Sequence, residues 1–141
     1  RLSLPITFGY GAITFTFVGR CYPDSPNYLT KGAREMTDRE LLELAAKAAG
    51  YGVEWDDVDC PWNPLNDDGD SRRLQVALSI DLRFGVSSNF GPYVHARSEM
   101  RRGDVIDFHE CYQWVSLHPD ANAAVRRVVL EVAAAIGQSM P

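Results

Sequence analysis

An unbroken apolar stripe near the C-terminus limits the folds that are open to this chain. Apolar residues recur there at the spacing of one helix face: Val125, Val128, Val129, Val132, Ala133 and Ile136. Asp120 is a typical N-cap residue ahead of the stripe, and Gly137 is a typical residue for its end. The sequence therefore predicts a long amphipathic helix whose apolar face must pack against another layer of structure.

A second helix is predicted over about residues 38–49. Its apolar positions also share one face: Leu41, Leu44, Ala45 and Ala48. Thr37 and Glu40 have the spacing of a capping box, and Gly50 can supply a left-handed C-terminal cap. This helix should therefore begin directly after Met36.

Two periods compete between Leu74 and Val86. Every second residue is apolar, which alone favours a strand. The segment 66–71 just upstream is rich in N-cap residues and acidic groups, which favour the start of a helix. We therefore predict a helix over about residues 68–79, followed by a strand over about residues 81–87.

Three other segments are predicted as strands. Residues 51–55 are typical of a short strand, and the turn at 88–91 should return residues 92–97 antiparallel to the strand before it. After a second turn at 101–104, residues 105–115 alternate between two faces. One face carries Ile106, Phe108, Tyr112 and Trp114, and the other carries Asp107, His109, Cys111 and Gln113. One side of this strand should therefore lie in a core.

Residues 1–35 are predicted to be translated upstream sequence or an extension, and residues 36–141 to be a single domain. Met36 opens a segment with the pattern of a natural start, and Lys31–Ala33 can be encoded by the purine-rich ribosome-binding sequence of bacteria at a customary distance before it. The alternative is that Ala12–Val18 is a genuine strand, because it is rich in β-forming residues. Deletion of residues 1–35 distinguishes the two.

Composition excludes several classes of function. The chain has 14 Lys and Arg against 19 Asp and Glu, a net charge of −5, which argues against a general nucleic-acid binder. No apolar run is long enough to span a membrane, and no segment has a P-loop or dinucleotide fingerprint, so we expect no membrane partner and no cofactor. Cys21, Cys60 and Cys111 form no CxxC pair, which fits a reduced, cytoplasmic compartment.

Three segments of residues 36–141 resemble a family of small proteins of tailed phages and prophages, the phage ABA sandwich domain. They are Leu41–Gly50, Trp62–Asp70 and the segment from Ala123 to Gly137. The resemblance implies an α+β fold, a three-layer α/β/α sandwich with about three helices on both faces of a small, mainly antiparallel sheet. It implies no established activity and no catalytic residues, and it places the protein in the cytoplasm of an infected bacterial host.

Three acidic residues form the first cluster that could carry chemistry. Asp67, Asp68 and Asp70 could bind a hard cation such as Ca²⁺ or Mg²⁺ through carboxylate oxygens. The pattern fails as an EF-hand, because Gln75 stands where the twelfth-position Glu belongs. We favour the interpretation that these residues cap a helix, and we predict no metal site.

Cysteine and histidine offer a weaker cluster. His109 and Cys111 share a strand face that Cys60 could approach, but a fourth ligand and a spacing signature are missing. A surface histidine and a buried cysteine are the favoured interpretation. Cys111 as a nucleophile with His109 as its base is disfavoured, because neighbours on one strand face point in parallel.

Arginine pairs and tryptophans are the remaining candidates for contact with a ligand or partner. The pairs Arg72 with Arg73, Arg101 with Arg102, and Arg126 with Arg127 could bind phosphates or an acidic partner if they converge. Solvated helix faces and a loop are the favoured interpretation. Trp55, Trp62 and Trp114 could line a cleft, although we expect at least two of them to pack in the core.

The leading functional hypothesis is a non-enzymatic phage accessory protein that binds a host protein or a small molecule. Its weak contact candidates are Trp62, the three acidic residues 67, 68 and 70, and the arginines 72, 73, 126 and 127. The alternative is a small metal-dependent nucleotide-processing enzyme that uses the acidic cluster. A third hypothesis is an oligomer-forming structural part, which exposed apolar residues at a sheet edge would indicate.

Overall fold

The computed structural model describes residues 2–8, 11–17, 36–52 and 61–141, the first two segments by their backbone. The elements in chain order are β1 (Leu2–Phe8), β2 (Gly11–Phe17), α1 (Asp38–Ala49), α2 (Asp68–Ala77), β3 (Asp81–Ser87), β4 (Gly91–Arg102), β5 (Val105–Trp114), the single 3₁₀ turn η2 (Val115–Leu117) and α3 (Ala121–Ser139). Within the described part of the chain, no helix combines the length and apolarity needed to cross a bilayer.

The five strands form one sheet in the order β1-β2-β5-β4-β3. Neighbours pair antiparallel except β2 and β5, which pair in parallel with Ile13 opposite Ile106. β2 corresponds to the strand alternative for Ala12–Val18, while the start of the native chain at Met36 stays a prediction. Of the predicted strand 51–55, Tyr51 and Gly52 are not extended in a strand, and the rest lies outside the described residues.

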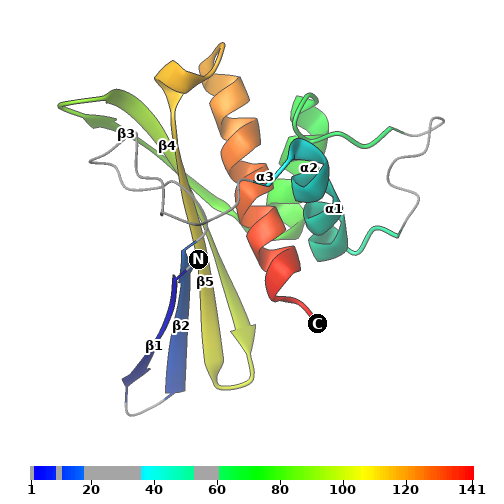
Figure 1. The fold of residues 1–141 in the computed structure, drawn as a ribbon, viewed down its shortest axis with the longest axis vertical. Coiled ribbons are helices and arrows are strands. Elements are labelled where there is room, and N and C mark those ends of the chain that lie inside the picture. The colour runs from blue at the N-terminus through cyan, green and yellow to red at the C-terminus, as the bar shows by residue number, and fades with distance from the viewer. Residues whose placement is uncertain (1, 9–10, 18–35, 53–60) are drawn as a thin grey trace.

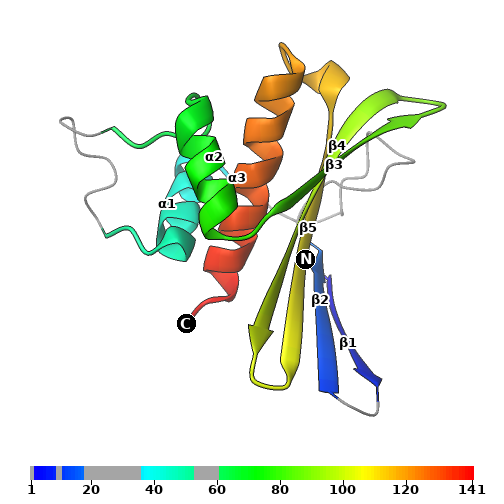
Figure 2. The same ribbon diagram turned by 180° about the vertical axis from the view of Figure 1, so that it is seen from behind.

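All three α-helices lie on one side of the sheet (Figures 1 and 2). α3 contacts β4 and β5, and both α1 and α2 contact α3. The α+β class, the three helices and the mainly antiparallel sheet are confirmed. The described layers run from the sheet to α3 and then to α1 with α2, instead of placing helices on both faces.

The composition of α3 explains this layering. Besides the predicted stripe, Leu130, Ala134 and Ala135 are also buried, so the second half of α3 is apolar on more than one side. A helix that is apolar all round is a buried helix. α3 can therefore pack on the sheet and on α1 at the same time, and it forms the middle layer.

Gly137 marks a close approach of α3 to α1. It was predicted to end the last helix, and this is wrong because α3 continues to Ser139. A Cβ atom added at Gly137 would overlap the Leu44 carbonyl oxygen and lie 2.7 Å from the carbonyl carbon. Glycine is present because the backbones of the two helices nearly touch there.

Both termini of α1 follow the predicted local rules. Thr37 and Glu40 form the capping box of α1, and Gly50 caps its end with a positive φ of 79°. Residues 74–86, where the sequence fits both a helix and a strand, are helical in their first part and extended in their second. α2 ends at Ala77, and Ser79 with a φ of 51° turns the chain into β3.

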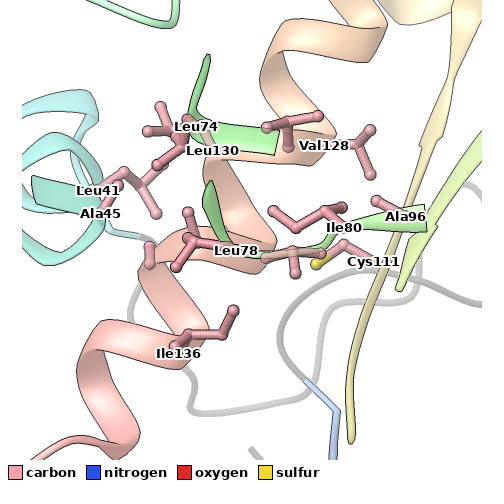
Figure 3. Packing of buried hydrophobic residues seen from close by; sticks show 14 of the residues in the cluster. Leu41, Ala45, Leu74, Leu78, Ile80, Ala96, Cys111, Val128, Leu130 and Ile136 are labelled. Carbon is pink, nitrogen blue, oxygen red and sulfur yellow. The ribbon is translucent and has the colours of Figure 1, made fainter. Parts of the chain in front are cut away.

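The main core lies between the helices and the inner side of the sheet. Figure 3 shows Leu41, Leu74 and Leu130 meeting from three helices, with Ala96 and Cys111 at the sheet. Cys111 is fully buried, which confirms its interpretation as a small apolar side chain. His109 is also fully buried, so its prediction as a surface histidine is wrong.

Candidate ligand site on the outer face of the sheet

Alternation along β4 separates two faces of the sheet. Val94, Ala96 and Ser98 are buried on the side that packs against the helices. The intervening residues of a strand point to the opposite face. We call this side of β3, β4 and β5 the outer face, and it carries Asp81, Arg83, Tyr93, His95, Arg97, Glu99, Phe108, Glu110 and Tyr112.

Cross-strand register arranges these side chains in rows. Arg83 of β3 lies opposite His95, and His95 lies opposite Tyr112 of β5. In the next row Arg97 lies between Asp81 and Glu110. Residues directly opposite in antiparallel strands have their Cβ atoms about 4.5–5.5 Å apart, so side chains within a row can contact one another.

A pocket of about 350 Å³ lies on this face, and we call it the outer pocket. It is lined by Ser79, Asp81, Arg83, His95, Arg97 and Glu99. The turn after α2 and the strands β3 and β4 supply these residues. The pocket therefore combines two guanidinium groups, two carboxylates, an imidazole and a hydroxyl in one hollow.

His95 forms a firm wall of the outer pocket. Its ring stacks on Tyr112 with centroids 4.2 Å apart and an angle of 14° between the planes. Its Nε2 atom lies 3.7 Å from a carboxylate oxygen of Glu110. Burial lowers the pKa of His95, and the charges of Arg83 and Arg97 lower it further against the opposing effect of Glu110. His95 therefore presents a neutral ring at neutral pH.

Arg97 is held by two contacts on β5. Its guanidinium carbon lies 4.4 Å from the centre of the Phe108 ring, within the range of a cation–π interaction. Its Nε atom lies 3.7 Å from the same Glu110 oxygen that faces His95. Glu110 therefore positions both His95 and Arg97, although it does not line the outer pocket itself.

The Tyr93 ring lies over Gly85 of β3, beside the outer pocket. A Cβ atom on Gly85, which lies opposite Tyr93, would be 2.5 Å from the Tyr93 hydroxyl. The ring therefore occupies the space that a side chain at position 85 would take. It also lies beside Tyr112 and Trp114, at centroid distances of 6.0 and 5.8 Å.

The predicted acidic cluster has structural contacts instead of an open coordination site. Asp67 caps α2 by accepting a hydrogen bond from the Asp70 amide at 2.7 Å, and Asp68 pairs with Arg126. Asp70 is buried and accepts hydrogen bonds from the Asn63 amide and from Arg73. The capping interpretation is confirmed for Asp67. Among the described residues, no three His, Cys, Asp or Glu side chains are grouped to hold a metal ion.

The predicted arginine pairs make separate local contacts. Arg72 and Arg73 bind Gln75 and Asp70 on their own helix, which fits the solvated interpretation. That interpretation is wrong for Arg126 and Arg127, whose side chains are only 18% and 20% exposed. Arg126 binds the Leu65 carbonyl and Asp68, while Arg127 binds Glu131 and Asp38 at the start of α1.

The tryptophans pack as expected where the structure describes them. Trp62 is partly buried against the core, and its ring lies 5.1 Å from that of Tyr51. Trp114 is buried beside Phe90. Trp55 and Cys60, and with Cys60 the proposed soft metal site, lie outside the described residues.

Sequence reasoning missed the outer pocket entirely. Arg83, His95 and Arg97 were not among the candidates, although the predicted hairpin already placed their two strands side by side. The available signal was the second face of that hairpin, which is charged while the first is apolar. Comparison of the chain with protein-family models, with curated proteins and with solved structures finds no match.

Proposed function

We propose that this chain is a non-enzymatic binding module that takes a small polar molecule with an anionic group into the outer pocket. The observation that carries the proposal is the pair of guanidinium groups in one hollow. Arg97 is held in place by Phe108 and Glu110, and Arg83 makes no ion pair with a described residue. Guanidinium groups bind carboxylates and phosphates through two parallel hydrogen bonds.

The volume of the outer pocket is compatible with a small molecule, and its walls are polar. Ligand pockets commonly have volumes of about 300–1,000 Å³, and this pocket of 350 Å³ lies within that range. Asp81 and Glu99 add acceptors on the same surface, so the ligand should also carry hydrogen-bond donors. The neutral His95 ring offers a flat wall without a further charge.

The biological setting is part of the same proposal. The resemblance of residues 36–141 to the phage ABA sandwich proteins supports an accessory protein of a phage or prophage that acts in the host cytoplasm. The acidic balance of the chain supports a partner other than nucleic acid. A host protein stays the alternative partner.

The test is a ligand screen on the full chain with matched variants. Native mass spectrometry identifies molecules that copurify, and a thermal-shift series uses inorganic phosphate, nucleoside monophosphates and amino acids. A ligand present at a hundred times its Kd stabilises the fold by about 2.7 kcal/mol. Arg97→Gln should abolish this stabilisation, while Arg101→Gln, which changes an exposed arginine of the same strand outside the outer pocket, should retain it.

Two outcomes oppose the proposal. A ligand that stabilises wild type and Arg97→Gln equally binds elsewhere. Capture of a host protein in pull-downs by both variants, with no small molecule bound, favours the host-protein alternative.

A further inference from the structure

The edge strand β3 exposes two large apolar side chains. Phe84 is 68% exposed and Val86 is 77% exposed. Both lie on the side of β3 that faces the helices, together with the half-buried Leu82. β3 is the last strand of the sheet, so no described strand pairs with its outer edge.

The helix-facing side of this edge strand lacks the charges that protect natural edge strands against association. Natural edge strands carry inward-pointing charges, prolines or bulges that prevent pairing with another chain. β3 carries Leu82, Phe84 and Val86 on its apolar side, and its two charged residues, Asp81 and Arg83, point to the outer face. Its own charges cancel, although the chain as a whole is acidic.

We propose that a second copy of this chain pairs with β3, antiparallel and edge to edge, and continues the sheet across a two-fold axis at Phe84. Phe84 is the middle residue of Asp81–Ser87, so this register pairs the whole strand. Phe84 then faces Phe84 of the second copy, and Leu82 faces Val86 of that copy. Such cross-strand apolar pairs are the unit of sheet stabilisation.

The same register produces no repulsion between charged residues on the outer face of β3. Asp81 faces Ser87 of the second copy, and Arg83 faces Gly85 of that copy, so no charge stands directly opposite another. The space above Gly85 is filled by the ring of Tyr93, which places an aromatic ring beside the incoming guanidinium. This arrangement gives a second copy an advantage over an arbitrary extended peptide, whose side chains would match this order only by chance.

The pairing also brings the two candidate sites onto one surface. Asp81 and Arg83 form the part of the outer pocket that is nearest to the sheet edge. The second copy adds its own β3 on the same side of the continued sheet. The two outer pockets therefore lie on one continuous face, on either side of the axis.

Sedimentation of the full chain over roughly 1–200 µM tests the association, because a dimer depends on protomer concentration. Wild type should dimerise, and Phe84→Lys should weaken the dimer by tenfold or more, on the order expected for an interface centre. Val76→Lys is the matched control, because Val76 is 66% exposed but lies on α2. Unchanged circular dichroism and melting temperature verify that the variants are folded.

A mixing experiment tests the register. Phe84→Lys and Phe84→Glu should each be monomeric alone, and an equimolar mixture should recover the dimer because position 84 faces itself. A monomeric wild type over the whole concentration range rejects a second copy as the occupant of this edge. A dimer that Phe84→Lys leaves intact, or a mixture that stays monomeric, rejects pairing about Phe84.

Discussion

Gly137 of α3 packs directly against the backbone carbonyl of Leu44 in α1, with no room for a side chain between them. Alanine normally stabilises a helix interior relative to glycine by about 1 kcal/mol. At this position we expect the reverse, because Gly137→Ala must separate the two helices, and such overpacking costs about 1–3 kcal/mol. Urea denaturation measures the difference. Gln138→Ala at the exposed neighbouring position should change stability by less than about 0.5 kcal/mol, and equal effects of the two substitutions would contradict the close approach.

Ser79 adopts a backbone conformation that suits glycine better. Its φ of 51° lies in the left-handed region, which costs an L-residue about 1–2 kcal/mol. We expect Ser79→Gly to stabilise the protein by about 0.5–1 kcal/mol, after the greater freedom of glycine in the unfolded chain is included. Ser79→Ala keeps the strain and should give no gain. Thermal unfolding of wild type, Ser79→Gly and Ser79→Ala shows whether the left-handed backbone at residue 79 destabilises the protein.

Stability should fall as the pH drops below the ordinary histidine value. Burial lowers the pKa of both His95 and His118 below 6.5 in the folded protein. The unfolded chain therefore binds more protons as the pH falls from 6.5 toward the lowered values, and protonation favours unfolding there. The melting temperature should decrease over this window and be constant above it.

Substitution of the two histidines tests this cause. The double variant His95→Gln with His118→Gln should lose less stability between about pH 7 and pH 5 than wild type does. His118 also accepts or donates a hydrogen bond with Gln113 at 2.9 Å, so His118→Gln alone is measured first at neutral pH to separate that contact. Parallel pH curves for wild type and the double variant would assign the acid sensitivity to other groups.

Residues 36–141 should fold without the first thirty-five residues. β1 and β2 lie at one edge of the sheet beside β5, and the contacts that join α1, α2, α3, β4 and β5 to one another form within residues 36–141. We expect the shortened chain to retain cooperative unfolding with a melting temperature within a few degrees of the full chain. Loss of cooperative unfolding would show that β1 and β2 are required for the fold, as the pairing of β2 with β5 in the sheet allows.

Local rules predicted most of the elements. The bounds of α1 and β3 were found from caps and period alone, since Thr37, Glu40 and Gly50 fix the ends of a helix by short-range contacts. The end of α3 was predicted too early because glycine is a common sign of a helix end. A glycine can also stand inside a helix where close packing leaves no room for a side chain. At Gly137 the requirement comes from Leu44, nearly a hundred positions away, and a local pattern cannot show it.

The candidate site was harder to predict than the fold for a related reason. Arg83 and His95 are joined by a predicted hairpin, so their contact could have been found by assigning the faces of its strands. The contacts of Glu110 with His95 and Arg97 could not be found from that hairpin, because they also depend on the register of β4 with β5. The acidic cluster attracted attention because it is contiguous, whereas the outer pocket is assembled from residues that alternate along two strands.

The parallel pairing of β2 with β5 has a consequence for the order in which the sheet forms. Between these two neighbouring strands the sequence places α1, α2, β3 and β4. Contacts between segments so distant in sequence form slowly, because a long loop must close before they stabilise anything. We therefore expect β2 to join β5 later than the local hairpins β3–β4 and β4–β5 close.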